Sequence, residues 1–150
     1  MRVLGIAVSP GGGRPKIHGA IVSGTLSDPV LQGEFELKAS DGDASEQAVD
    51  LARLLQGKLA GLEFDKAVIR TAGSSPVANR RRAQFSRAHA EGAAMFVLRE
   101  HSKLPVATGD PGQFAKGLPI SKDQLTAMAK ALSASKHDAA IAALSELPRD

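Results

Sequence analysis

The segment RVLGIAVS, residues 2–9, runs into the glycine-rich turn PGGGRP and then into a second strand-like segment, KIHGAIVSG, residues 16–24. Residues 2–9 are almost continuously apolar, which is typical of a central strand covered on both faces of a sheet. Because another strand follows the glycines, the turn lacks the strand-to-helix context of a phosphate-binding loop and is predicted to be a hairpin connection. The chain is therefore expected to open with two neighbouring strands.

Three further segments have strand character. Residues 31–39, LQGEFELKA, alternate apolar and polar side chains like a half-exposed strand, and KAVIRT (66–71) and LPVAT (104–108) are short apolar segments. Strands separated by helices usually form parallel pairs through right-handed crossovers. We predict an α/β fold with a five-stranded mixed sheet, in which a three-strand meander is followed by two parallel crossovers, with helices on both faces. At 150 residues the chain is expected to form one domain.

Helix starts are predicted from capping signals at three places: Asp43 with Glu46, Ser75, and Ser121 with Gln124. The helix that starts near Ser75 is expected to be the longest, since it continues to the segment before the fifth strand. Residues 110–120 are expected to contain a short helical turn. The final helix is predicted from Ser135 to about Leu147.

Composition excludes several classes of protein. The chain has no cysteine, and its four histidines are scattered without metal-ligand spacing, so disulfide frameworks and zinc sites are not expected. No apolar segment reaches the roughly 20 residues that a bilayer requires, and no export segment precedes the first strand, so we expect a cytoplasmic protein without membrane contact. The net charge of +3 suits polyanionic partners. With only five aromatic residues, all phenylalanine, base stacking is not expected to dominate.

The order of these elements, together with four local segments, resembles the ribonuclease H-like superfamily and, within it, the RuvC-type Holliday-junction resolvases. The resemblance extends over nearly the whole chain, and four segments carry it locally: MRVLGI (1–6), FDKAVIR (64–70), RAHAEGAAMFVLREHSKLPVATGDPGQFAKG (87–117) and SKHDAAIAAL (135–144). The resemblance implies a nuclease fold in which about four carboxylates hold two divalent metal ions, which are hard cations that require anionic oxygen ligands.

The resemblance also implies where those carboxylates would stand. The family has an aspartate in the first strand, a glutamate at the end of the fourth and two acids on the last helix. In this sequence the corresponding positions are Ala7, Arg70, Ser135 and Asp138. Alanine offers no ligand atom, and arginine is a permanent cation that opposes metal binding. We therefore expect a degenerate catalytic site with no bound metal and no cofactor.

Two structural roles are expected for the residues at these positions. Asp138 is interpreted first as the third residue of a capping box opened by Ser135. Arg70 is predicted to form an ion pair with Asp138 across the position of the family's metal site, although Glu63 and Asp65 are alternative partners for its guanidinium.

A basic segment is the strongest remaining signal for a partner. Asn79 is followed by Arg80, Arg81 and Arg82, and Arg87 comes later in the same predicted helix. A run of charge is often only solvated surface, but such a cluster can also neutralise several phosphates. We predict a nucleic-acid contact made by these arginines and joined by Arg14, Lys16 and Lys116.

We therefore expect a nucleic-acid-binding or assembly protein whose partner is DNA or RNA. Because the relatives are homodimers, we also expect a homodimer. The apolar stretch AAMFVL (93–98) could belong either to the core or to the dimer interface. Two alternatives stay open. The first is an active Mg²⁺- or Mn²⁺-dependent endonuclease that uses Asp110 and Asp138. The second is a scaffold that contacts only other proteins.

Overall fold

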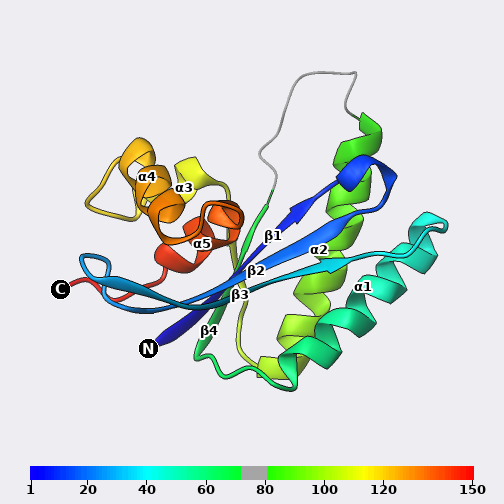
Figure 1. Ribbon diagram of the computed structural model, residues 1–150, viewed down its shortest axis with the longest axis horizontal. Helices are drawn as coiled ribbons and strands as arrows, with labels where there is room; N and C mark the ends of the chain where they lie inside the picture. Colours follow the sequence, from blue (N-terminus) through cyan, green and yellow to red (C-terminus); the bar gives the residue numbers. More distant parts are fainter. Residues whose placement is uncertain (72–80) are drawn as a thin grey trace.

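The computed structural model describes residues 1–71 and 81–150, with side chains described from residue 85 onward in the second segment (Figure 1). The strands are β1 (Arg2–Ser9), β2 (Lys16–Gly24), β3 (Pro29–Lys38), β4 (Lys66–Arg70) and β5 (Ala107–Gly109). The helices are α1 (Ala44–Leu59), α2 (Arg81–Ser102), α3 (Pro111–Lys116), α4 (Lys122–Leu132) and α5 (His137–Leu144). A single 3-10 turn, Gly11–Gly13, connects β1 to β2.

The five strands form one mixed sheet in the order β3-β2-β1-β4-β5. The first three strands are antiparallel neighbours, whereas β1 pairs with β4 and β4 with β5 in parallel. Figure 1 shows α1 and α2 on one side of the sheet and α3, α4 and α5 on the other. This arrangement confirms the predicted meander, the two parallel crossovers and the helices on both faces.

Each face of the sheet has its own apolar core. Leu4, Ile6 and Ile69 point toward α1 and α2, where they meet buried residues such as Leu51 and Leu98. The alternate strand positions point toward α4 and α5, where the helices contribute mostly alanine and leucine. Because β1 is covered on both sides, six of its eight residues are buried, as its continuous apolar sequence predicts.

The small side chains of α5 let this helix approach β1 very closely. A Cβ atom added to Gly5 would lie 2.0 Å from the carbonyl oxygen of Ala139 and 2.6 Å from the amide nitrogen of Ala143. No side chain fits at position 5 without moving the backbone of the helix. The close approach brings the first turn of α5 directly over the end of β1 and β4.

Two predicted helix starts are confirmed by their hydrogen bonds. The side chain of Asp43 accepts from the amide of Glu46, and Ser121 forms a reciprocal capping box with Gln124. The predicted capping box at the final helix is wrong. Helix α5 begins at His137 after Lys136, and no side chain caps it. The start predicted at Ser75 lies outside the described residues.

Two details of the sheet differ from the sequence prediction. A bulge at Ile21 and Val22 shifts the pairing with β3, so that Leu31 packs on the α4 and α5 side while Phe35 packs on the other. Strand β5 begins at Ala107 rather than at residue 104. Pro105 has no amide hydrogen to donate to a neighbouring strand, and Leu104 is 52% exposed in the connection from α2. No helix in the described part of the chain is long and apolar enough to cross a membrane.

Candidate functional site

One row of paired residues crosses the sheet beneath the start of α5. The row consists of Glu36 on β3, His18 on β2, Ala7 on β1, Arg70 on β4 and Gly109 on β5. Because side chains alternate along a strand, the members of the row that carry side chains share the face covered by α5. The register therefore places Ala7 and Arg70 side by side on adjacent strands. Both are positions at which the family resemblance implies a carboxylate.

Arg70 and Asp138 form an ion pair across this face. The Nε atom of Arg70 lies 3.7 Å from Oδ1 of Asp138, which stands in the first turn of α5. The side chain of Arg70 is 22% exposed and that of Asp138 is 46% exposed, so solvent weakens the attraction. The ion pair predicted from the sequence is confirmed. The other partners considered for Arg70 are engaged elsewhere, since Glu63 and Asp65 both bind Arg2.

A second set of ion pairs joins the other side of the α5 start to the sheet. The ammonium of Lys136 lies 3.2 Å from the carboxylate of Glu36, and the ammonium of Lys16 lies 2.9 Å from the same carboxylate. Hydrogen bonds from Lys16 and Lys136 lower the pKa of Glu36 to about 2. Sequence analysis missed this set, because Glu36 and Lys136 are 100 residues apart and only the β3 register brings them together.

His18 lies between these two ion-pair groups. Its Nε2 atom is 3.0 Å from the hydroxyl oxygen of Ser9, a contact that sequence analysis also missed. Burial, with a smaller contribution from Lys136, lowers the pKa of His18 below its usual value. Its Nδ1 atom is buried without a hydrogen-bond partner in the described structure. The serine and histidine thus lack the acid that orients the imidazole in a catalytic triad.

The residues at this site do not fit a pair of divalent metal ions. Ala7 presents only a methyl group, and Arg70 places a guanidinium where a ligand oxygen would be needed. Ser135 is exposed in the turn before α5 and caps nothing, which leaves Asp138 alone. Within residues 1–71 and 81–150, no group of three or more acids or histidines is close enough to hold a metal ion.

An open pocket of about 480 Å³ lies beside the ion pair. Arg70 and Asp138 form one wall, and α4 and the start of α3 form the others. Asp110 also lines this pocket, but its carboxylate is the N-cap of α3 and accepts a hydrogen bond of 2.9 Å from the amide of Gln113. The two acids of the alternative nuclease hypothesis therefore share a pocket, while one of them has a structural role.

Of the predicted nucleic-acid residues, the structure describes the side chains of Arg14, Arg87 and Lys116 in addition to Lys16. Arg87 is held by Glu91, with 2.9 Å between Nε and Oε1, and is largely buried. Arg14 donates from Nε to the backbone oxygen of Ala39. Lys116 is exposed at the end of α3 and makes no ion pair with any described residue. Arg80 and the side chains of Arg81 and Arg82 lie outside the described structure.

The strand order, the pairing directions and the helices on both faces define the ribonuclease H-like fold. RuvC from T. thermophilus, solved in complex with a Holliday junction substrate, has a TM-score of 0.71 to this chain at 16% identity, covering 97% of this chain and 91% of the other. A second structure of Thermus thermophilus RuvC gives 0.70 at 17% identity, covering 97% and 92%. No protein-family model and no curated protein sequence matches the chain. The chain therefore has the fold of RuvC.

Proposed function

We propose that the chain is a RuvC-like protein that binds nucleic acid without metal ions and does not cleave it. The observation that carries this proposal is the Arg70–Asp138 ion pair beside Ala7. In the resolvase family these positions supply carboxylates to two metal ions. Here one position has no polar atom and another has a fixed positive charge, so Asp138 is neutralised by the protein itself.

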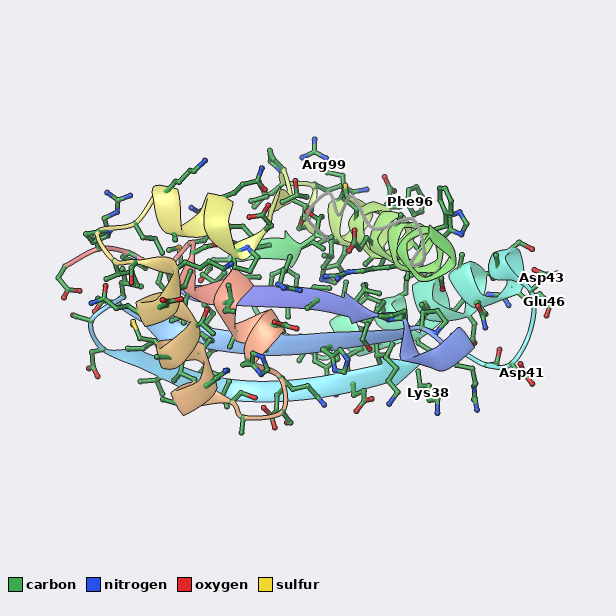
Figure 2. All side chains as sticks on the ribbon, turned by 90° about the horizontal axis from the view of Figure 1, so that it is seen from above. Lys38, Asp41, Asp43, Glu46, Phe96 and Arg99 are labelled. Carbon is green, nitrogen blue, oxygen red and sulfur yellow. The ribbon has the colours of Figure 1, made fainter. Side chains whose placement is uncertain are left out.

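Two observations support nucleic acid as the partner. The RuvC structure that superposes on 97% of this chain contains a Holliday junction. The chain also has a net positive charge of +3, and the acids of the β3–α1 region, Asp41, Asp43 and Glu46, gather at one end of the molecule (Figure 2). Helices α3, α4 and α5 lie toward the opposite end of the molecule (Figure 1), away from these acids, where a polyanion can approach.

The test combines a gel shift and a cleavage assay on a four-way junction, a duplex and an RNA–DNA hybrid. We expect a shift that persists in EDTA, weakens as salt rises, and is not followed by cleavage in Mg²⁺ or Mn²⁺. The triple variant Arg80→Ala, Arg81→Ala and Arg82→Ala is expected to bind more weakly than Arg99→Ala. Arg99→Ala is a control for the loss of one exposed arginine of the same helix, since Arg99 lies near its other end (Figure 2).

The alternative of an active nuclease rests on one observation, that Asp110 and Asp138 line the same pocket. Metal-dependent cleavage that disappears in Asp138→Asn would establish this alternative and overturn the main proposal. A chain that neither shifts nor cleaves any of the three substrates would instead support a protein-contact scaffold.

We also propose a homodimer that forms through α2. The stretch at 93–98 is divided in the structure: Val97 and Leu98 are buried in the core, whereas Phe96 is 63% exposed and points away from the sheet (Figure 2). Phe85 is also 63% exposed, and the space around Gly92 is open. In an antiparallel pair of α2 helices about a two-fold axis, Phe85 of one copy would face Phe96 of the other, with Gly92 allowing close contact.

A further inference from the structure

The pocket beside the Arg70–Asp138 ion pair is lined on one side by a polar stripe of α4. Lys122, Thr126 and Lys130 follow one another at intervals of four residues, so they share one face of the helix. Neither lysine makes an ion pair with any described residue, and both are exposed. The pocket therefore contains two ammonium groups, and no carboxylate in the described part of the chain contacts either of them.

The opposite wall adds the guanidinium of Arg70. Its Nε atom is buried and has no hydrogen-bond partner among the described residues, because Asp138 at 3.7 Å is too distant for one. His137 also lines the pocket, and its Nε2 atom lies 3.7 Å from the same Asp138 oxygen. One partly exposed carboxylate thus faces both an arginine and a histidine, and no described side chain accepts a hydrogen bond from Nε of Arg70.

The acids in the pocket cancel only part of this charge. Asp110 and Asp138 are the two acids in the lining, against the three basic side chains Arg70, Lys122 and Lys130. Asp110 is already bound to the amide of Gln113 at the start of α3. A guanidinium and two ammonium groups that line one open pocket supply positive charge and hydrogen-bond donors, which suit a phosphate oxyanion.

We propose that this pocket binds one phosphodiester group of a nucleic-acid backbone directly through Arg70, Lys122 and Lys130, with no metal ion between protein and phosphate. This proposal rests on the proposed function, and it places the nucleic-acid contact at this pocket. The guanidinium would donate hydrogen bonds to the phosphate oxygens, and the lysines would act as point charges on the α4 side. Binding at this pocket is independent of base identity, because only the backbone is contacted.

The test measures the affinity for a fluorescent four-way junction by anisotropy over a series of salt concentrations in EDTA. The double variant Lys122→Gln and Lys130→Gln is compared with Lys38→Gln and Arg53→Gln. The control removes the same charge from exposed residues of β3 and α1. We expect the pocket variant to bind at least about tenfold more weakly and to lose about one to two units of salt slope, whereas the control stays near the wild type.

A second measurement follows the Nε–Hε signal of Arg70 by NMR while unlabelled junction is added. We expect the chemical shift of this signal to change with junction concentration and to reach a plateau at the same concentration as the binding curve. Suppose that the wild type binds the junction, that the pocket variant and the control variant have the same affinity, and that the Arg70 signal does not shift. The proposed binding site is then wrong, while the proposed function stands. If the wild type binds no nucleic acid at all, both fail.

Discussion

At the carboxyl end of β4, Arg70 places a permanent charge between Ala7 and Asp138. A guanidinium does not lose its proton in proteins, so the local potential stays unfavourable to divalent cations at every accessible pH. The ion pair itself is partly exposed, and pairs of this kind typically contribute only about 0–1 kcal/mol to stability. The ion pair therefore matters for the charge that it places at the site more than for the stability of the fold.

Glu36 gives a pH-dependent signature for the contacts beneath α5. Its pKa is lowered from 4.5 to about 2 by Lys16 and Lys136. Since the folded-state pKa is below the unfolded value, the stabilisation is complete above about pH 4.5 and is lost as the pH falls toward 2. We predict that Lys136→Met raises the pKa of Glu36 toward 4.5, as measured by carboxyl ¹³C NMR titration.

The control for this titration is Lys130→Met, which removes a lysine from the neighbouring helix without touching Glu36. It should leave the pKa of Glu36 near 2. An unchanged pKa in Lys136→Met would show that the contact between α5 and β3 does not form in solution.

At the scale of elements, the close approach of α5 to β1 positions the site. Gly5 permits this approach, because a side chain there would overlap the helix backbone at Ala139 and Ala143. We predict that Gly5→Ala destabilises the fold by about 3 kcal/mol or more, since the rigid helix backbone must move to make room. The free energy of unfolding in urea, measured by circular dichroism, tests this.

Gly33→Ala is the matched control for Gly5→Ala. A Cβ atom at Gly33, which lies in the edge strand β3, would have nothing within 4 Å. This change should alter stability by less than about 1 kcal/mol. Equal effects of the two substitutions would contradict the close packing of α5 on β1.

Most elements could be predicted from the sequence because their signals are local. The caps at Asp43 and Ser121 and the apolar β1 depend on residues a few positions apart, so the sequence predicts them, whereas the capping box of Asp110 with Gln113 is not among the predictions. The β-bulge at Ile21 and the pairing of Lys136 with Glu36 depend on strand register, which no local pattern reveals. The Arg70–Asp138 pair could be predicted only because the family resemblance placed both residues at one site.

The start of α5 shows why local signals can also mislead. Ser135 and Asp138 have the spacing of a capping box, but the helix begins two residues later. The hydroxyl of Ser133 accepts from the amide of Lys136 and donates to Glu34 at 2.5 Å, which anchors the turn to β3. Tertiary contacts therefore decide where this helix starts.

At the scale of the whole molecule, the exposed phenylalanines of α2 are consistent with association of two copies. We predict that Phe96→Glu makes the chain monomeric in sedimentation velocity, because a buried charge would then face a partner phenylalanine. Val30→Glu is the control, since Val30 is 47% exposed on β3, away from α2. A wild-type chain that sediments as a monomer, or a Phe96→Glu variant that stays dimeric, would contradict this interface.

The direct test of the central claim is isothermal titration calorimetry of the wild-type chain with Mn²⁺. Because Ala7 offers no ligand and Arg70 repels cations, we predict no saturable binding, and the same baseline for the wild type and for Asp138→Asn. Saturable binding of a pair of Mn²⁺ ions in the wild type, abolished in Asp138→Asn, would contradict a site in which an ion pair stands in place of the metals.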